Sequence, residues 1–224
     1  MNMSMKLRAL CASCTIAALL IAASNGLSAA SAAKGVPDAP RSDRSQATYR
    51  GGLITPPLAK PQFTLTDTSG APFDFRLETQ GYVTLLFFGY THCPDECPSH
   101  MAAIASGLRQ VPQDVRNQVK VVFVTADPVR DSSTVLRAWL DHFDTQFIGL
   151  TGGATTIEAA QRAARIPAAS KTILGNKTYQ LAHASFVLAY TKDNMAHVIY
   201  PGGIAPLDWA HDLPLLVNEK WLSN

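Results

Sequence analysis

Cys93 and Cys97 are separated by three residues in the stretch FFGYTHCPDECPSHM, residues 87–101. A pair with this spacing can act as a redox couple, bind a metal ion or form a structural disulfide. A disulfide across so short a loop removes little chain entropy and would stabilise the fold weakly. Disulfide-stapled proteins also carry several pairs, whereas the other two cysteines, Cys11 and Cys14, lie in an N-terminal targeting segment. A structural disulfide is therefore the least favoured of the three interpretations.

The residues around the pair favour an anionic sulfur. An apolar run precedes Cys93 and a helical pattern follows Cys97, which predicts a strand ending at the pair and a helix beginning there. The free amides and the dipole at a helix N-terminus lower the pKa of a thiol. If the segment is helical throughout, the two sulfurs share one face. The carboxylates of Asp95 and Glu96 oppose thiolate formation if their charges are close, but they do not repel a cation.

A metal site here needs more than two thiolates. Thiolates select copper(I), zinc or iron–sulfur clusters, and imidazole commonly completes a copper or zinc site. His100 lies three residues after Cys97 on the same helical face, and His183 precedes a predicted strand. Spacing does not choose between them. The other histidines are His92 and His197, whose side-chain directions are open, and His142 and His211, expected on polar helix faces.

The elements that must position these residues alternate along the chain. Continuous apolar runs predict buried strands at residues 82–88 and 119–124, with a shorter strand at 147–150. Alternating residues predict a hairpin around 63–66 and 73–75 and a late strand pair at 185–190 and 196–200. Predicted helices cover residues 98–111, 132–143, 155–165 and 207–221. This order predicts an α/β domain with a mixed central sheet flanked by helices, with the cysteines where thioredoxin-type folds keep their chemistry.

The N-terminal part has a different composition. Residues 1–32 carry Lys6 and Arg8 and no acidic residue, then an apolar stretch and small residues, the layout of a secretory signal peptide. An uncleaved membrane anchor is the alternative, although about fifteen apolar residues are short for a span. We expect a flexible linker over residues 33–60 and the folded domain over 61–224, in the periplasm or at the outer face of the inner membrane. Without Lys6 and Arg8 the basic residues fall from 19 to 17, equal to the 17 acidic ones, so nothing predicts nucleic-acid binding.

Four ordered segments resemble a known family. FFGYTHCPDECP is similar to the signature of the Sco/SenC family of copper-binding thioredoxin-like proteins. Residues 124–131, VTADPVRD, resemble the family's D-P-x-R-D segment, and residues 147–152, FIGLTG, follow as in the family. Residues 179–190, YQLAHASFVLAY, resemble the segment that carries the family's third copper ligand. Together these segments cover most of residues 61–200 in the family's order.

The resemblance implies a thioredoxin-like fold with copper bound by Cys93, Cys97 and His183. It implies a role in assembling the copper centre of cytochrome c oxidase, and it favours His183 over His100. In the family an acidic residue often precedes the ligand histidine, whereas this sequence has Ala182. If that acidic residue helps to orient the imidazole, its absence affects the metal affinity of the site more than the existence of the site.

The sequence allows two interpretations of the aspartates in the D-P-x-R-D segment, Asp127 and Asp131. Asp127 and Asp131 could accept hydrogen bonds behind the metal ligands or anchor their loop. The simpler alternative is that they form a helix N-cap and a surface ion pair with Arg130.

Two functional hypotheses follow. The leading one is a metallochaperone that carries copper(I) or copper(II) to the copper-binding subunit of cytochrome c oxidase, with another copper chaperone or a thiol reductase as a further partner. The alternative is a thiol–disulfide oxidoreductase that keeps the oxidase cysteines reduced, with Cys93 as the attacking thiolate and Cys97 as its redox partner. His183 is essential to the first hypothesis and dispensable to the second.

Overall fold

The structure is a computed structural model that describes residues 49–175 and 178–221. Every described residue belongs to one compact unit, Ser45–Asn224. The predicted signal peptide and linker residues 33–48 therefore lie outside the described residues. Among the helices of the described part, none combines the length and the apolar character that a membrane crossing needs.

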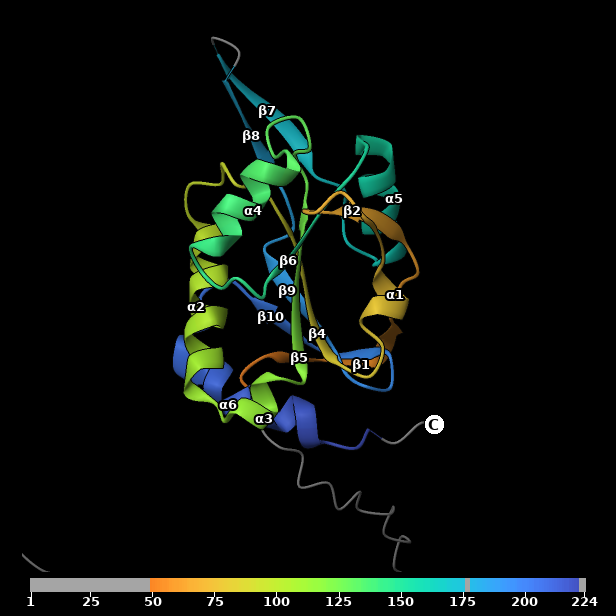
Figure 1. Cartoon of the computed structure of the whole chain (residues 1–224), viewed down its shortest axis with the longest axis vertical. Helices are drawn as coiled ribbons and strands as arrows, with labels where there is room; N and C mark the ends of the chain where they lie inside the picture. The colour runs from red at the N-terminus through yellow and green to blue at the C-terminus, as the bar shows by residue number, and fades with distance from the viewer. Residues whose placement is uncertain (1–48, 176–177, 222–224) are drawn as a thin grey trace, which may run out of the picture. The chain divides into compact units, whose positions relative to one another are not determined.

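A mixed sheet of eight strands forms the centre of the domain, as predicted (Figure 1). Its order is β1-β10-β9-β4-β5-β6-β2-β3. β4, β5 and β6 are parallel to one another, while β9 and β2 pair antiparallel on either side of them. The strands are β1 (Gly52–Ala59), β2 (Thr64–Asp67), β3 (Pro72–Asp74), β4 (Val83–Gly89), β5 (Val119–Thr125), β6 (Ile148–Thr151), β9 (Phe186–Tyr190) and β10 (Met195–Pro201).

Helices cover both faces of this sheet, which explains why β4 is apolar without alternation. Val83, Leu85 and Phe87 join the core on one face, whereas Leu86 and Phe88 join the core on the other. A strand buried on both faces needs apolar residues at every position. The first face carries α2 (Glu96–Gln110), α3 (Gln113–Arg116), α4 (Ser133–Asp141) and α6 (Pro206–Asn218), and the second carries α1 (Phe75–Glu78) and α5 (Ala154–Ala163).

The predicted linker over residues 33–60 is wrong in its last part, because Gly52–Ala59 forms β1. This strand lies at the edge of the sheet and pairs antiparallel with β10, with an irregular register between Leu53 and Leu58. Pro56 and Pro57 occupy that interruption. Proline lacks an amide donor and is tolerated on edge strands and at bulges, so the two prolines hid the strand in the sequence pattern. The folded domain therefore begins before residue 61.

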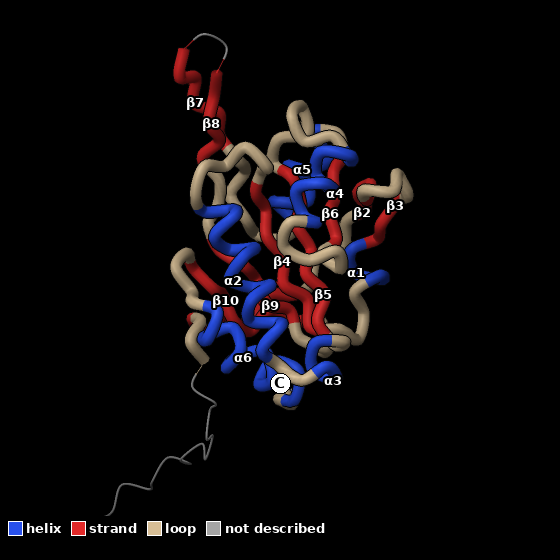
Figure 2. The backbone as a smooth tube through the Cα atoms, turned by 60° about the vertical axis from the view of Figure 1, so that its left-hand side comes forward, coloured by secondary structure: helices blue, strands red, loops and turns tan. Residues whose placement is uncertain are grey.

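A second, two-stranded sheet was not predicted. β7 (Ser170–Gly175) and β8 (Thr178–Ala182) form an antiparallel hairpin that projects from the body of the domain (Figure 1 and Figure 2). All six residues of β7 are exposed, so this strand buries no apolar face that would reveal it in the sequence, whereas β8 alternates exposed and partly buried residues. β8 ends directly before His183, and the hairpin therefore delivers that residue to the rest of the fold.

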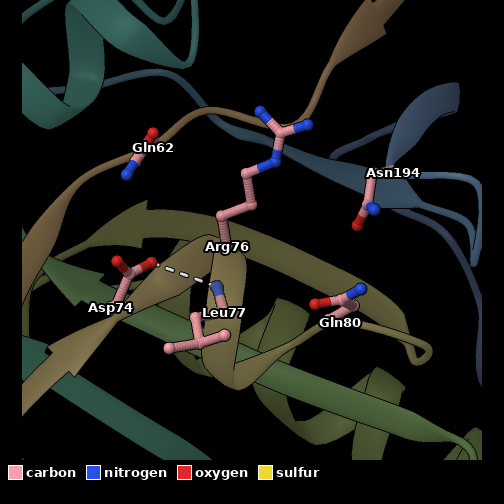
Figure 3. Close-up of a pocket in the computed structure, with 6 residues that line it drawn as sticks. All are labelled: Gln62, Asp74, Arg76, Leu77, Gln80 and Asn194. Carbon is pink, nitrogen blue, oxygen red and sulfur yellow. Dashed lines mark hydrogen bonds between the residues drawn. The ribbon is translucent and has the colours of Figure 1, made fainter.

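The other end of β4 holds a polar pocket. Its volume is about 410 Å³ and it is lined by Gln62, Asp74, Arg76, Leu77, Gln80 and Asn194 (Figure 3). Gln80 precedes the start of β4, while the cysteines follow its end. The pocket is therefore separated from the cysteines by the length of the strand.

Candidate metal centre

The two cysteines occupy the turn from β4 into α2, as predicted. Only Cys97 is helical, because α2 begins at Glu96 and Cys93 lies in the preceding loop. The N–H of Cys97 donates to the Cys93 sulfur at 3.5 Å. This amide is one of the donors that a first helical turn leaves unpaired, so the Cys93 sulfur lies where the helix stabilises negative charge.

The Cys97 Sγ packs closely against Gly89 at the end of β4, and this contact fixes its position. A Cβ added at Gly89 would lie 2.7 Å from the Cys97 Sγ and 2.7 Å from a ring carbon of Phe87. Only a residue without a side chain fits between them. Cys97 is fully buried, Cys93 is partly exposed, and both are free thiols.

His183 faces both sulfurs. Its Nε2 lies 3.4 Å from the Cys97 Sγ and 3.9 Å from the Cys93 Sγ. Its Nδ1 lies 3.0 Å from the carbonyl oxygen of Ala184, which can only accept, so Nδ1 carries the proton and donates. The Nε2 lone pair then points toward the thiols. Phe87 and Tyr90 hold the ring edge-on, with centroid distances of 5.8 and 5.5 Å.

The two thiols differ in acidity. A hydrogen bond from the Cys97 thiol, together with the backbone N–H groups of Cys97 and Asp95, lowers the pKa of Cys93 to about 4. Burial, followed by the neighbouring Cys93 sulfur, raises the pKa of Cys97. The side-chain charges of Asp95 and Glu96, expected to oppose thiolate formation if close, are not among the main causes of this shift. The Glu96 carboxylate accepts a hydrogen bond from the Ser185 hydroxyl at 2.7 Å.

The three side chains can converge on one ion. The ligand atoms of Cys93, Cys97 and His183 all lie within 4.8 Å of one another. Two sulfurs and one imidazole nitrogen match the soft and borderline metals, copper(I) and zinc above all. In the described part of the chain this is the one group of three or more His, Cys, Asp or Glu residues with such convergence.

The other histidines lie elsewhere. His100 is buried in α2 against Phe87, and its Nε2 has no hydrogen-bond partner, but it does not join the three-residue group. His197 stacks on Trp221 and pairs with Asp193. His92, His142 and His211 are exposed.

Asp131 anchors the loop that leads to Cys93 through hydrogen bonds with Thr91. Its carboxylate is fully buried and accepts from the backbone N–H of Thr91 at 2.9 Å and the Thr91 hydroxyl at 2.6 Å. The Thr125 hydroxyl donates to it at 2.7 Å. The N-cap of α4 is Ser132, whose hydroxyl accepts from the N–H of Val135. The anchoring interpretation of Asp131 is therefore correct and the N-cap interpretation is wrong.

Sequence reasoning missed Gly89 and Tyr90 as parts of the site. Tyr90 packs on His183, and its hydroxyl accepts from the N–H of Leu181 at 3.4 Å. Both residues lie in the FFGYTHC stretch, so their position directly before the cysteines was the available signal. Their partners come from the distant segment around His183, which no local pattern reveals.

Comparison with known proteins decides the family. The family model described as SCO1/SenC matches residues 53–217, about three quarters of the chain. The chain belongs to the SCO1/SenC family. Its described site residues and its whole eight-stranded sheet fall inside or at the margin of the matched region.

Among relatives, a Stutzerimonas stutzeri protein that is provisionally named as copper-binding is 36% identical over 116 residues, 51% of this chain and 56% of that protein. The chain spans about half the length of the curated relatives it matches. The copper-bound structure of Bradyrhizobium japonicum ScoI is 29% identical, with a TM-score of 0.64 over 71% of this chain and 99% of that one. The solution structure of apo Sco1 from Thermus thermophilus is 26% identical, with a TM-score of 0.69 over 78% and 100%. These SCO1/SenC neighbours confirm the thioredoxin-like fold.

Proposed function

We propose that this SCO1/SenC protein is a copper metallochaperone that binds its cargo through Cys93, Cys97 and His183. The observation that carries the proposal is the convergence of the three ligand atoms within 4.8 Å. The donor set suits copper(I), and the imidazole can also hold copper(II). Likeness to a copper-bound ScoI at 29% identity supports copper over zinc.

Each ligand has a separate task. Cys93 is partly exposed and already anionic at neutral pH, because its pKa is lowered to about 4, so it meets the incoming ion first. Cys97 is a buried thiol that must release its proton when the ion binds. His183 presents a lone pair on Nε2, since Nδ1 is held by the Ala184 carbonyl. An ion bound at a partly exposed site can leave by stepwise ligand exchange with a partner.

The receiving partner in this proposal is the copper-binding subunit of cytochrome c oxidase, at its dinuclear copper centre. Membership of the SCO1/SenC family supports this destination. The predicted signal peptide over residues 1–32 supports delivery on the exported side of the membrane, with retention of that segment as an anchor as the alternative.

A second candidate function has its own observation. The lowered pKa and partial exposure of Cys93 are features of an attacking thiolate. In a thiol–disulfide oxidoreductase, Cys93 would attack a partner's disulfide and release one partner thiolate. Cys97 would then lose its proton and attack the mixed disulfide, which releases the second partner thiolate and leaves a Cys93–Cys97 disulfide. A thiol reductase would have to reduce that disulfide before the next cycle.

A copper titration of the reduced full-length chain, with a competing chelator, separates the two functions. We expect His183→Ala to weaken copper(I) binding by about tenfold or more and His100→Ala to leave it near wild type. His100 is the matched control because it is a buried histidine beside Phe87 that lies outside the three-residue group. Equal affinities for wild type and His183→Ala would contradict the three-ligand site and favour the oxidoreductase.

A further inference from the structure

The two halves of the candidate metal centre come from distant parts of the chain. Cys93 and Cys97 follow β4, whereas His183 follows the β7–β8 hairpin. On the far side of His183, β9 begins at Phe186 and pairs with β4 in the main sheet. The hairpin before His183 forms a sheet of its own and is largely exposed, so strand pairing with the main sheet does not hold it. Other contacts must hold the base of the hairpin.

The loop between β5 and α4 makes those contacts through Tyr179. The Tyr179 hydroxyl donates to the carboxylate of Asp127 at 2.8 Å. Arg130 donates to the Tyr179 carbonyl at 3.2 Å, and its guanidinium carbon lies 3.8 Å from the centroid of the Tyr179 ring. Arg130 and Asp127 are themselves ion-paired, and the side chain of Asp127 is only 4% exposed. Asp127 and Arg130, both in the loop between β5 and α4, thus hold the side chain and the backbone of Tyr179.

The same loop also holds the cysteine side of the site. Asp131, one residue after Arg130, accepts both hydrogen bonds from Thr91, which lies two residues before Cys93. Residues 127–131 therefore contact the segments that lead to both groups of ligands. We call this segment the brace.

We propose that Arg130 and Asp127 are positioning residues that set the place of the His183 imidazole relative to the two thiols by holding Tyr179. The inference rests on the proposed copper site, because it concerns how that site is assembled. When residues that orient the metal ligands without binding the metal are replaced, metal affinity typically falls by about 10–100-fold.

The test measures copper(I) affinity of the reduced full-length protein for Tyr179→Phe and Arg130→Met. Tyr179→Phe removes only the hydroxyl that contacts Asp127 and keeps the ring. Lys171→Met is the matched control, because the Lys171 ammonium lies 3.5 Å from the centroid of the same ring but is exposed and makes no described contact with the brace. We expect about tenfold weaker binding for Arg130→Met, a smaller loss for Tyr179→Phe, and affinity within twofold of wild type for Lys171→Met.

A double-variant cycle separates positioning from other effects. If Arg130 acts through His183, adding Arg130→Met to His183→Ala costs no further affinity. A loss that persists without the imidazole would mean that the guanidinium acts on the thiols by charge, and it would overturn the proposal. The absorption spectrum of the copper(II) form, which reports ligand geometry, should change in Tyr179→Phe and stay unchanged in Lys171→Met.

The outcomes also separate this inference from the proposed function. If His183→Ala itself binds copper like wild type, the copper site as proposed is wrong and the brace has nothing to position. If His183→Ala binds weakly while Arg130→Met and Tyr179→Phe both match wild type, the copper site stands and the positioning role is refuted. Tyr179→Phe keeps the test decisive even if Arg130→Met fails to fold.

Discussion

Replacing Gly89 offers a direct way to displace one sulfur of the proposed copper site without changing any of its three proposed ligands. In Gly89→Ala the new Cβ would lie 2.7 Å from the Cys97 Sγ and 3.1 Å from a ring carbon of Phe123. Ordinary contacts of a Cβ begin at 3.4 Å, so the sulfur must move by roughly 0.7 Å, the difference between those two distances. Metal–ligand distances tolerate about 0.2 Å. The displaced sulfur therefore cannot keep its place in a three-ligand site.

Two quantities should change in this variant. Overpacking a filled core costs about 1–3 kcal/mol, so the free energy of unfolding of the metal-free protein should fall by that amount. The copper(I) affinity should fall as well, by about 10-fold to 100-fold, which corresponds to about 1.4–2.8 kcal/mol. Chemical denaturation measures the first quantity and chelator competition the second.

Gly149→Ala is the control. Gly149 lies in β6, and a Cβ there would lie 2.7 Å from a methyl carbon of Leu140 and 2.8 Å from one of Thr68, with no metal ligand among its nearest atoms. It should lose similar stability and keep wild-type copper affinity. If Gly89→Ala loses stability like Gly149→Ala but binds copper as tightly as wild type, the buried Cys97 sulfur is not a ligand at the position described.

Three further predictions concern separate groups. In the reduced, metal-free protein, mass spectrometry should show that Cys93 is alkylated at least tenfold faster than Cys97. The Cys93 rate should stay level from about pH 8 down to pH 5 and fall as the pH approaches the Cys93 pKa of about 4. Equal alkylation rates for the two cysteines would contradict the assigned acidities. Asp131→Asn puts an amide against the donors from Thr91 and should cost about 1–3 kcal/mol in urea unfolding, so an unchanged midpoint would show that the buried carboxylate is not needed. Burial lowers the pKa of Lys60 to about 8, so the unfolded chain binds the extra proton above that pH and stability should rise by about 2 kcal/mol from pH 7 to 10; Lys60→Met should lose this rise, and parallel pH profiles for the two proteins would refute it.

The central strands were predictable from sequence because their burial leaves a strong pattern. β4 and β5 lie between two layers of helices, so their residues are apolar at nearly every position. The cysteine pair between such a strand and a helix likewise placed one half of the site. β1 was missed because Pro56 and Pro57 interrupt an edge strand. The β7–β8 hairpin was missed because β7 is exposed along its whole length and has no apolar face to reveal it.

The choice between His100 and His183 shows where local patterns stop. His100 has the right helical spacing to Cys97, yet its ring turns into the core against Phe87. His183 reaches the sulfurs through a hairpin that tertiary contacts hold, which spacing along the chain does not encode. The resemblance to the Sco/SenC family favoured His183, whose Nε2 lies 3.4 Å from the Cys97 Sγ, and its role as a ligand stays a prediction. Asp131 was expected either to anchor its loop or to cap a helix, and only the three-dimensional contacts with Thr91 and Thr125 decided between the two.

The most direct test of the central claim is X-ray absorption spectroscopy of the copper(I)-loaded, reduced full-length protein beside its His183→Ala variant. We predict two sulfur ligands and one imidazole nitrogen for wild type, with the nitrogen lost in His183→Ala. Two sulfurs with no nitrogen in wild type, or an unchanged nitrogen in His183→Ala, would contradict a site built from Cys93, Cys97 and His183.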